Sequence, residues 1–144
     1  MSGESGLAEK RTKKDQAART CTLHVCVSCR ANDCPREPRQ DRTGAHHYRE
    51  LRAFFENHPL RDRVEVKPVQ CLSLCPRPCG IALSSPGKWS YLFGDQQQGS
   101  SAEDIAACVA LYLVTDDGVM PREERPKSLR ASILGRVPPM SRAG

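Results

Sequence analysis

Three cysteines crowd into one nine-residue stretch, Cys71 to Cys79, and this stretch constrains the chain more than any other. Cys71, Cys75 and Cys79 recur at every fourth position, a spacing that would place them on one face of a helix. Pro76 and Pro78 argue against a helix, because each removes an amide donor and pushes the preceding residue toward extended geometry. We therefore expect a tight loop that can turn several sulfur atoms toward one point.

A second group of thiols lies upstream, in the Cys-x-x-Cys segment of Cys26 and Cys29, among eight cysteines in 144 residues. Residues 1–20 are polar and charged, so they predict no secretory signal, and no stretch is apolar enough to predict a membrane span. We therefore expect a cytoplasmic protein with reduced thiols, where clustered cysteines more often bind metal or do redox work than form disulfides.

The net charge of +5 comes from the ends of the chain. Residues 1–20 carry five basic and three acidic side chains, and residues 121–144 carry six and two. The middle, residues 21–120, carries eleven basic and twelve acidic side chains. With only seven aromatic residues in addition, the sequence disfavours a nucleic-acid partner, which would need a basic face on the folded part.

Hydrophobic periodicity predicts six elements between two ragged ends. Their expected ranges are strands at 22–27, 63–69, 80–84 and 88–93, and helices at 43–57 and 100–114, the last with a capping box of Ser100 and Glu103. Residues 28–42 are expected to form a long loop. Strand, helix, strand, cysteine loop, hairpin and helix predict a thioredoxin-like α/β sandwich of order βαβ–(Cys loop)–ββα, with other arrangements of the same βαβββα elements as the alternative.

The domain division follows from composition. We expect a disordered arm at 1–20, the thioredoxin-like metal-binding domain at 21–118, and a Pro/Arg-rich C-terminal extension at 119–144. Within the extension, residues 127–135 suit one or two helical turns, and otherwise a surface wrap or a tail.

Two histidines and one cysteine on the predicted helices are expected to have no part in the metal site. His46 and His47 are adjacent on the first helix, point in different directions and are expected to be exposed. Cys108 lies on the apolar stripe of the second helix and is expected to be a small core residue.

The two cysteine groups are expected to meet. Cys26 ends the first strand, while Cys71 and Cys75 follow the second, and the carboxyl ends of parallel neighbouring strands lie at one edge of a sheet. Thiolates are soft ligands that suit Zn²⁺, Cu(I) and iron–sulfur clusters. The helix that follows Cys29 begins many residues later, near Thr43, so we expect its dipole to be out of reach and rank thiol–disulfide exchange below metal binding.

The cysteine segments and their surroundings resemble two known protein families. Val25-Cys26, Cys71-Leu72-Ser73-Leu74-Cys75 and the segment 86–91 resemble the thioredoxin-like [2Fe-2S] ferredoxins. The pattern from about residue 23 to 138, with Arg77-Pro78-Cys79 and residues 91–95, resembles more closely a bacterial family of unknown function described as predicted metal-binding proteins.

The resemblance implies a ligand set. In the ferredoxins one cysteine ends the first strand, one lies in the following loop, and a Cys-x-x-x-Cys pair completes the site, which implies Cys26, Cys71 and Cys75. The second position corresponds to Cys29 by the uncharacterised family and to Cys34 by the ferredoxin spacing, and Cys79 is an alternative ligand with no ferredoxin counterpart.

The expected function is metal binding rather than catalysis. We predict a [2Fe-2S] cluster held by Cys26, Cys29, Cys71 and Cys75 for electron transfer, with an unidentified redox or metal-handling protein as partner. A zinc site, structural or metal-handling, is the alternative, and a thiol–disulfide oxidoreductase using Cys26 and Cys29 is the third. The residues supply no Ser/His/Asp set, phosphate loop or paired carboxylates for an enzyme of another class.

Overall fold

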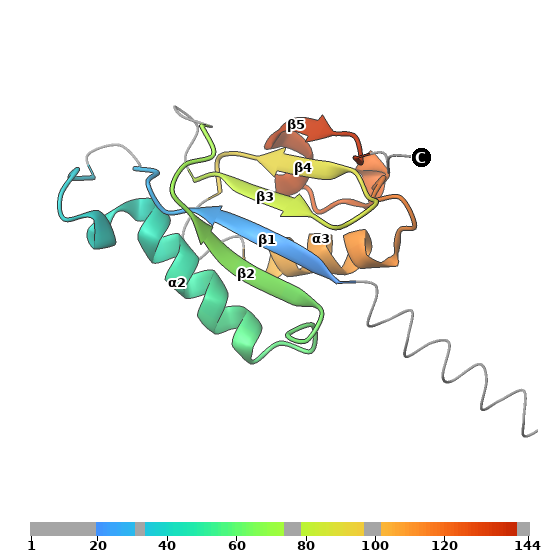
Figure 1. Cartoon of the computed structure of the whole chain (residues 1–144), viewed down its shortest axis with the longest axis horizontal. Coiled ribbons are helices and arrows are strands. Elements are labelled where there is room, and N and C mark those ends of the chain that lie inside the picture. The colour runs from blue at the N-terminus through green and yellow to red at the C-terminus, as the bar shows by residue number, and fades with distance from the viewer. Residues whose placement is uncertain (1–19, 31–33, 74–78, 97–101, 141–144) are drawn as a thin grey trace, which may run out of the picture.

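The computed structural model describes residues 20–30, 34–73, 79–96 and 102–140, which form a mixed α/β domain (Figure 1). Its sheet has the strand order β2-β1-β3-β4-β5. The strands are β1 Cys21–Cys26, β2 Val64–Val69, β3 Ile81–Ser84, β4 Ser90–Phe93 and β5 Ile133–Val137. The helices are α2 Thr43–Glu56, α3 Ala102–Val114 and the single turn α4 Ser128–Ala131, with 3-10 turns η1 Arg39–Asp41 and η2 Arg122–Glu124.

The topology confirms the predicted βαβ–ββα arrangement. β1 and β2 are parallel neighbours joined through α2, with Cys26 in register with Val69. β3 runs antiparallel to β1, and β4 returns beside β3 after the turn at Gly87, whose φ of +74° lies in the left-handed region that glycine tolerates. This arrangement is the thioredoxin-like sandwich expected from the hydrophobic pattern.

The sheet continues beyond the predicted elements. β5 pairs antiparallel with β4, so residues 133–137 form the outer strand of the sheet. Leu129 and Met120 from the same segment are buried in the main core. Of the alternatives expected for residues 127–135, a single helical turn is present as α4, whereas the strand β5 was not expected. Gly135 and Arg136 interrupt the apolar run and hide the strand pattern there.

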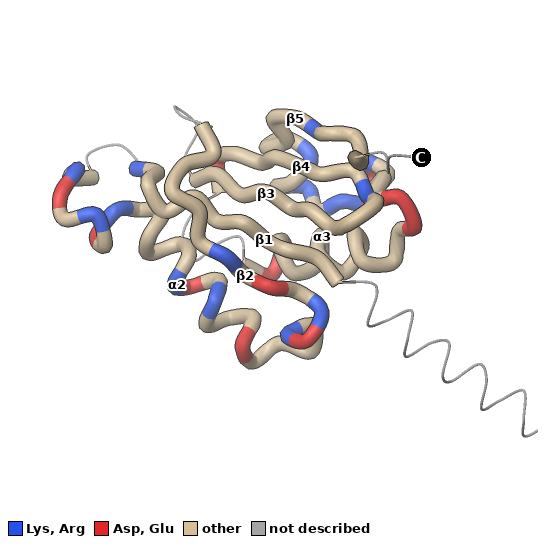
Figure 2. The backbone as a smooth tube through the Cα atoms, viewed as in Figure 1, with Lys and Arg blue, Asp and Glu red and all other residues tan. Residues whose placement is uncertain are grey.

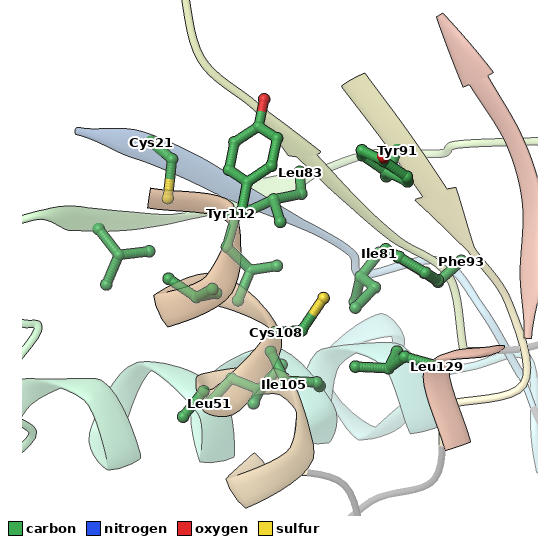
Figure 3. Close-up of a cluster of buried hydrophobic side chains, with 14 of the residues drawn as sticks. Cys21, Leu51, Ile81, Leu83, Tyr91, Phe93, Ile105, Cys108, Tyr112 and Leu129 are labelled. Carbon is green, nitrogen blue, oxygen red and sulfur yellow. The ribbon is translucent and has the colours of Figure 1, made fainter. Parts of the chain in front are cut away.

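Both long helices cover one face of the sheet (Figure 3). Alternate β1 residues Cys21, Leu23 and Val25 point into this layer, because successive side chains of a strand face opposite sides. α2 and α3 supply the other half of the core. Cys108 is among the α3 side chains, with its Sγ 3.7 Å from the Sδ of Met120, so its prediction as a core residue is confirmed.

One prediction about the histidines is wrong. His47 is only 1% exposed, and neither ring nitrogen has a hydrogen-bond partner in the described part of the chain. Burial lowers its pKa to about 4. His47 lies one turn after Gly44 and one turn before Leu51 on the face of α2 that packs on the sheet. Because adjacent helix residues point in different directions, packing that face inward buries one histidine of the pair.

Two predictions cannot be followed further. The N-terminal arm, up to residue 19, and the Ser100 cap lie outside the described residues. In the segments that the structure does describe, every helix is too short or too polar to cross a bilayer.

Candidate metal centre

The site lies where β1 and β2 end. The Val27 amide donates to the Val69 carbonyl over 2.9 Å, which continues the parallel pairing past both strand ends. The chain leaving β2 then passes beside Cys26, where the Leu72 side chain packs and the Leu72 amide donates to the Cys26 sulfur. The predicted convergence of these two strand ends is therefore confirmed.

Three thiols form a small buried cluster at this edge, separate from the main core. Cys26, Cys29 and Cys79 are each no more than 2% exposed, and Val69 and Leu72 pack against them. We call Cys26, Cys29 and Cys79 the thiol cluster. It brings together the end of β1, the segment after it and the residue Cys79 before β3, so it depends on tertiary structure and not on one local motif.

The backbone fixes Cys79 in this cluster. Its amide donates to the Gln96 carbonyl over 3.0 Å, and the Gln96 amide donates back to the Cys79 carbonyl over 3.1 Å. The next residue, Gly80, accepts from the Cys26 amide over 3.1 Å. The Gln96 side chain is itself buried and donates to the Gly94 carbonyl and the Ser132 hydroxyl. Backbone hydrogen bonds therefore hold Cys79 to the segment after β4, and its neighbour Gly80 to the end of β1.

The thiols of the cluster differ in proton affinity. The Cys26 sulfur accepts hydrogen bonds from the Cys29 thiol and from the amides of Leu72, Ser28 and Cys29, which together lower the pKa of Cys26 against the opposing effect of burial. The pKa of Cys29 is raised, first by that same hydrogen bond and then by burial. Burial, with nearby negative charge at Cys26 and Cys34, raises the pKa of Cys79 to about 11.

These donors fit a thiophilic cation. Three buried thiols cannot all ionise next to one another without a positive charge to balance them, and a bound metal supplies that charge. Amides directed at sulfur are the kind of second-layer contact that orients and tunes thiolate ligands. In their described positions, however, no three His, Cys, Asp or Glu side chains are arranged around one point to hold a metal ion.

The remaining candidate ligands lie around the cluster or outside the description. Cys71 is exposed, and its Sγ accepts from the Ser73 amide over 3.2 Å. Cys34 is half-buried, with its Sγ near the carbonyls of Pro35 and Asp41 at 3.7 and 3.8 Å. Cys75 lies outside the described residues. Of the four predicted ligands, Cys26 and Cys29 lie together in the thiol cluster. Of the two alternative ligands, Cys79 belongs to this cluster and Cys34 does not.

The start of α2 forms the other wall of the site, which corrects an expectation from sequence. The Gly44 amide donates to the Cys29 carbonyl over 2.9 Å, so the first turn of α2 contacts the Cys26–Cys29 segment directly. A Cβ at Gly44 would lie 2.2 Å from the Cys26 carbonyl oxygen. The helix start is distant from Cys29 in sequence but adjacent in space, because the intervening loop returns to the strand end. A glycine in the first turn of a helix was the available sign of this close approach.

Comparisons with known proteins agree with the fold. The family described as "Protein of unknown function (DUF1636)" matches residues 23–139. A search of curated proteins found no match. Among solved structures, a thioredoxin-like [2Fe-2S] ferredoxin from Aquifex aeolicus is 17% identical, with a TM-score of 0.51 over 81% of this chain and 92% of that chain.

A second structure, of the wild-type thioredoxin-like [2Fe-2S] ferredoxin from the same organism, is 16% identical, with a TM-score of 0.50 over 81% of this chain and 97% of that chain. At this identity the likeness establishes a shared fold.

Proposed function

The chain belongs to this family of proteins of unknown function, and we propose that it binds a [2Fe-2S] cluster through cysteines and transfers single electrons to a protein partner. One observation carries the proposal: Cys26, Cys29 and Cys79 pack together in a buried cluster, against which Leu72, the residue after Cys71, also packs. The fold shared with thioredoxin-like [2Fe-2S] ferredoxins supports it.

The proposed ligands come from both sides of the strand edge. Cys26 ends β1 and Cys29 follows it, while Cys71 and Cys75 come after β2 in the sequence. Cys79 is the alternative ligand that the packing favours, because it lies in the thiol cluster, whereas Cys34 is a less favoured alternative. A bound cluster supplies one-electron redox chemistry whose potential depends on hydrogen bonds to sulfur and on solvent access.

The neighbouring residues have defined tasks in this proposal. The Leu72 and Ser28 amides donate to the Cys26 sulfur and would stabilise its negative charge as a ligand. Val69 and Leu72 pack over the thiols and limit the access of water. Gly44 allows α2 to close against the Cys26–Cys29 segment. These contacts are those expected of a site that holds sulfur ligands in a fixed, partly dry pocket.

The test is elemental analysis of the untagged protein purified without oxygen, together with its visible spectrum. The proposal predicts two iron and two sulfide per chain, with charge-transfer absorption that disappears in Cys26→Ser and persists in Cys108→Ser. A colourless protein with stoichiometric zinc would contradict the cluster and support the zinc alternative. Metal-free protein with a disulfide reductase activity that requires Cys26 would instead support thiol–disulfide exchange.

A further inference from the structure

A basic groove of about 420 Å³ borders the thiol cluster. One wall is a face of α2 that presents Tyr48, Arg49 and Arg52, and η1 adds Arg39. Among the described residues that line it, every charged side chain is an arginine. Figure 2 shows blue segments along α2 and in the loop before it. The positive charge is local, because residues 21–120 as a whole carry slightly more acidic than basic side chains.

Part of this groove is formed by the segment that carries two of the thiols. Val27 and Ser28 line it, and they are the two residues between Cys26 and Cys29. On the opposite side the lining includes Gln70, the residue before Cys71. The Ser28 amide also donates to the Cys26 sulfur, so one residue of the groove lining contacts the thiol cluster directly.

The arginines differ in how firmly they are held. The Nη2 of Arg49 donates to the Gln40 carbonyl over 2.8 Å and lies 3.0 Å from the Nδ1 of His46, so its guanidinium is positioned between η1 and α2. Arg52 pairs with Glu56 one turn along, over 3.4 Å, and both side chains are largely exposed. Such an exposed pair is weak and can be exchanged for a carboxylate of another molecule.

We infer that this groove docks an acidic protein segment, the electron-transfer partner's own contact loop, against the metal centre. The inference rests on the proposed function, because it assigns the partner of that same site. Arginines match carboxylates in a fixed two-pronged geometry, and Arg and Tyr are enriched at protein interfaces. The apolar part of the lining, including Val27, Ala45 and Pro68, suits an apolar side chain between acidic ones. Small interfaces of this kind are typical of transient redox encounters.

The lining favours protein over nucleic acid. Non-specific binding of single strands combines a basic groove with aromatic side chains on which successive bases stack. Tyr48 is the one aromatic side chain among the described residues of this lining. The short groove between η1 and the end of β2 offers room for a few residues of a peptide rather than a track for a nucleic-acid backbone.

The experiment measures fluorescence anisotropy of a labelled peptide, Glu-Glu-Leu-Glu-Glu, with the full iron-loaded chain. We expect binding that weakens at least tenfold between about 20 and about 200 mM salt, because the attraction is between exposed charges. The variant Arg49→Glu/Arg52→Glu is expected to lose binding at least tenfold with the visible spectrum unchanged. The matched control Arg122→Glu/Lys127→Glu changes the net charge equally at exposed positions on η2 and before α4, and is expected to bind as the unmodified chain does.

Each other outcome overturns the inference. Equal loss in the control variant would show attraction to overall charge, and equal affinity for free glutarate or phosphate would show a small-anion site. Tighter binding of an oligothymidine that requires Arg49 and Arg52 would show a nucleic-acid surface. If the iron-loaded protein does not bind the peptide, the inferred docking site is contradicted and the proposed function is unaffected. A chain that contains no iron when purified without oxygen contradicts the proposed function, and peptide binding through Arg49 and Arg52 would then show an acidic-peptide site that does not serve electron transfer.

Discussion

The Gly44 amide at the start of α2 donates to the Cys29 carbonyl over 2.9 Å, and this bond joins the crossover helix to the segment that carries two of the buried thiols. The helix can approach so closely because residue 44 has no side chain. The position of two proposed metal ligands, Cys26 and Cys29, thus depends on Gly44, which has no side chain that could bind metal.

Substitution Gly44→Ala is therefore expected to harm both the fold and the site. The added Cβ would lie 2.2 Å from the Cys26 carbonyl oxygen and 3.1 Å from the Cys29 amide nitrogen, and neither backbone atom can move without displacing the strand end. We expect the free energy of unfolding to fall by about 2 kcal/mol or more, as for overpacked interiors. Urea denaturation measures this loss. Gly135→Ala is the control, because its Cβ would meet only a Leu92 side-chain atom at 3.9 Å.

A pH dependence is expected from His47. Its pKa is lowered to about 4 by burial, against 6.5 for an ordinary histidine, so between these values the unfolded chain binds a proton that the folded chain does not. The free energy of unfolding should therefore decrease as the pH falls from about 6.5 toward 4, by up to about 1.4 kcal/mol per pH unit from this residue.

Denaturation of the unmodified chain and of His47→Leu at several pH values measures that contribution, since subtraction removes the carboxylates that both proteins share. The variant should show a shallower slope over this range. Identical slopes would mean that His47 is not buried as a neutral ring.

The two alternative ligands can be separated by substitution. Cys79 is buried in the thiol cluster and fixed by Gln96, whereas the Cys34 sulfur lies near two loop carbonyls. Cys79→Ser is expected to weaken metal binding by about tenfold or more, a loss typical of groups at or next to a metal, and Cys34→Ser by much less. Competition with a chelator measures both affinities. The reverse order would favour the ligand spacing of the ferredoxins and assign the second position to Cys34.

The loop cysteines give a further test. Cys71→Ser and Cys75→Ser are each expected to abolish stoichiometric metal binding, because they remove proposed ligands while the main core remains intact. Cys21→Ser and Cys108→Ser are the controls, since both thiols belong to that core (Figure 3) and not to the thiol cluster. Metal content per folded chain is the measurement. Loss of metal in a folded Cys108 variant would show that the ligands are assigned to the wrong end of the molecule.

The sequence predicted the part of the site that follows from topology. A strand, a helix and a second strand imply parallel neighbours, so the approach of Cys26 to the segment after Val69 could be inferred without a structure. The inward direction of Cys108 followed equally from the helix period.

Other features depended on how the chain returns in space. Gly44 follows Cys29 by many residues in the sequence, and the contact between its amide and the Cys29 carbonyl forms only in the folded chain. Cys79 joins the thiol cluster because Gln96 pairs with it across a loop, which no local spacing predicts. His47 differs from its neighbour His46 only by rotation about the helix, and the side that becomes buried is set by the sheet.

The thiol cluster and the main core divide at a single peptide bond, with Val25 in the core and Cys26 in the cluster. The hydrophobic layer under the sheet is complete without any sulfur ligand, so folding need not wait for a cofactor. We expect the newly synthesised chain to fold without the cluster and to bind iron only after the domain has folded. We then expect that the cluster can be inserted and removed repeatedly while the domain stays folded.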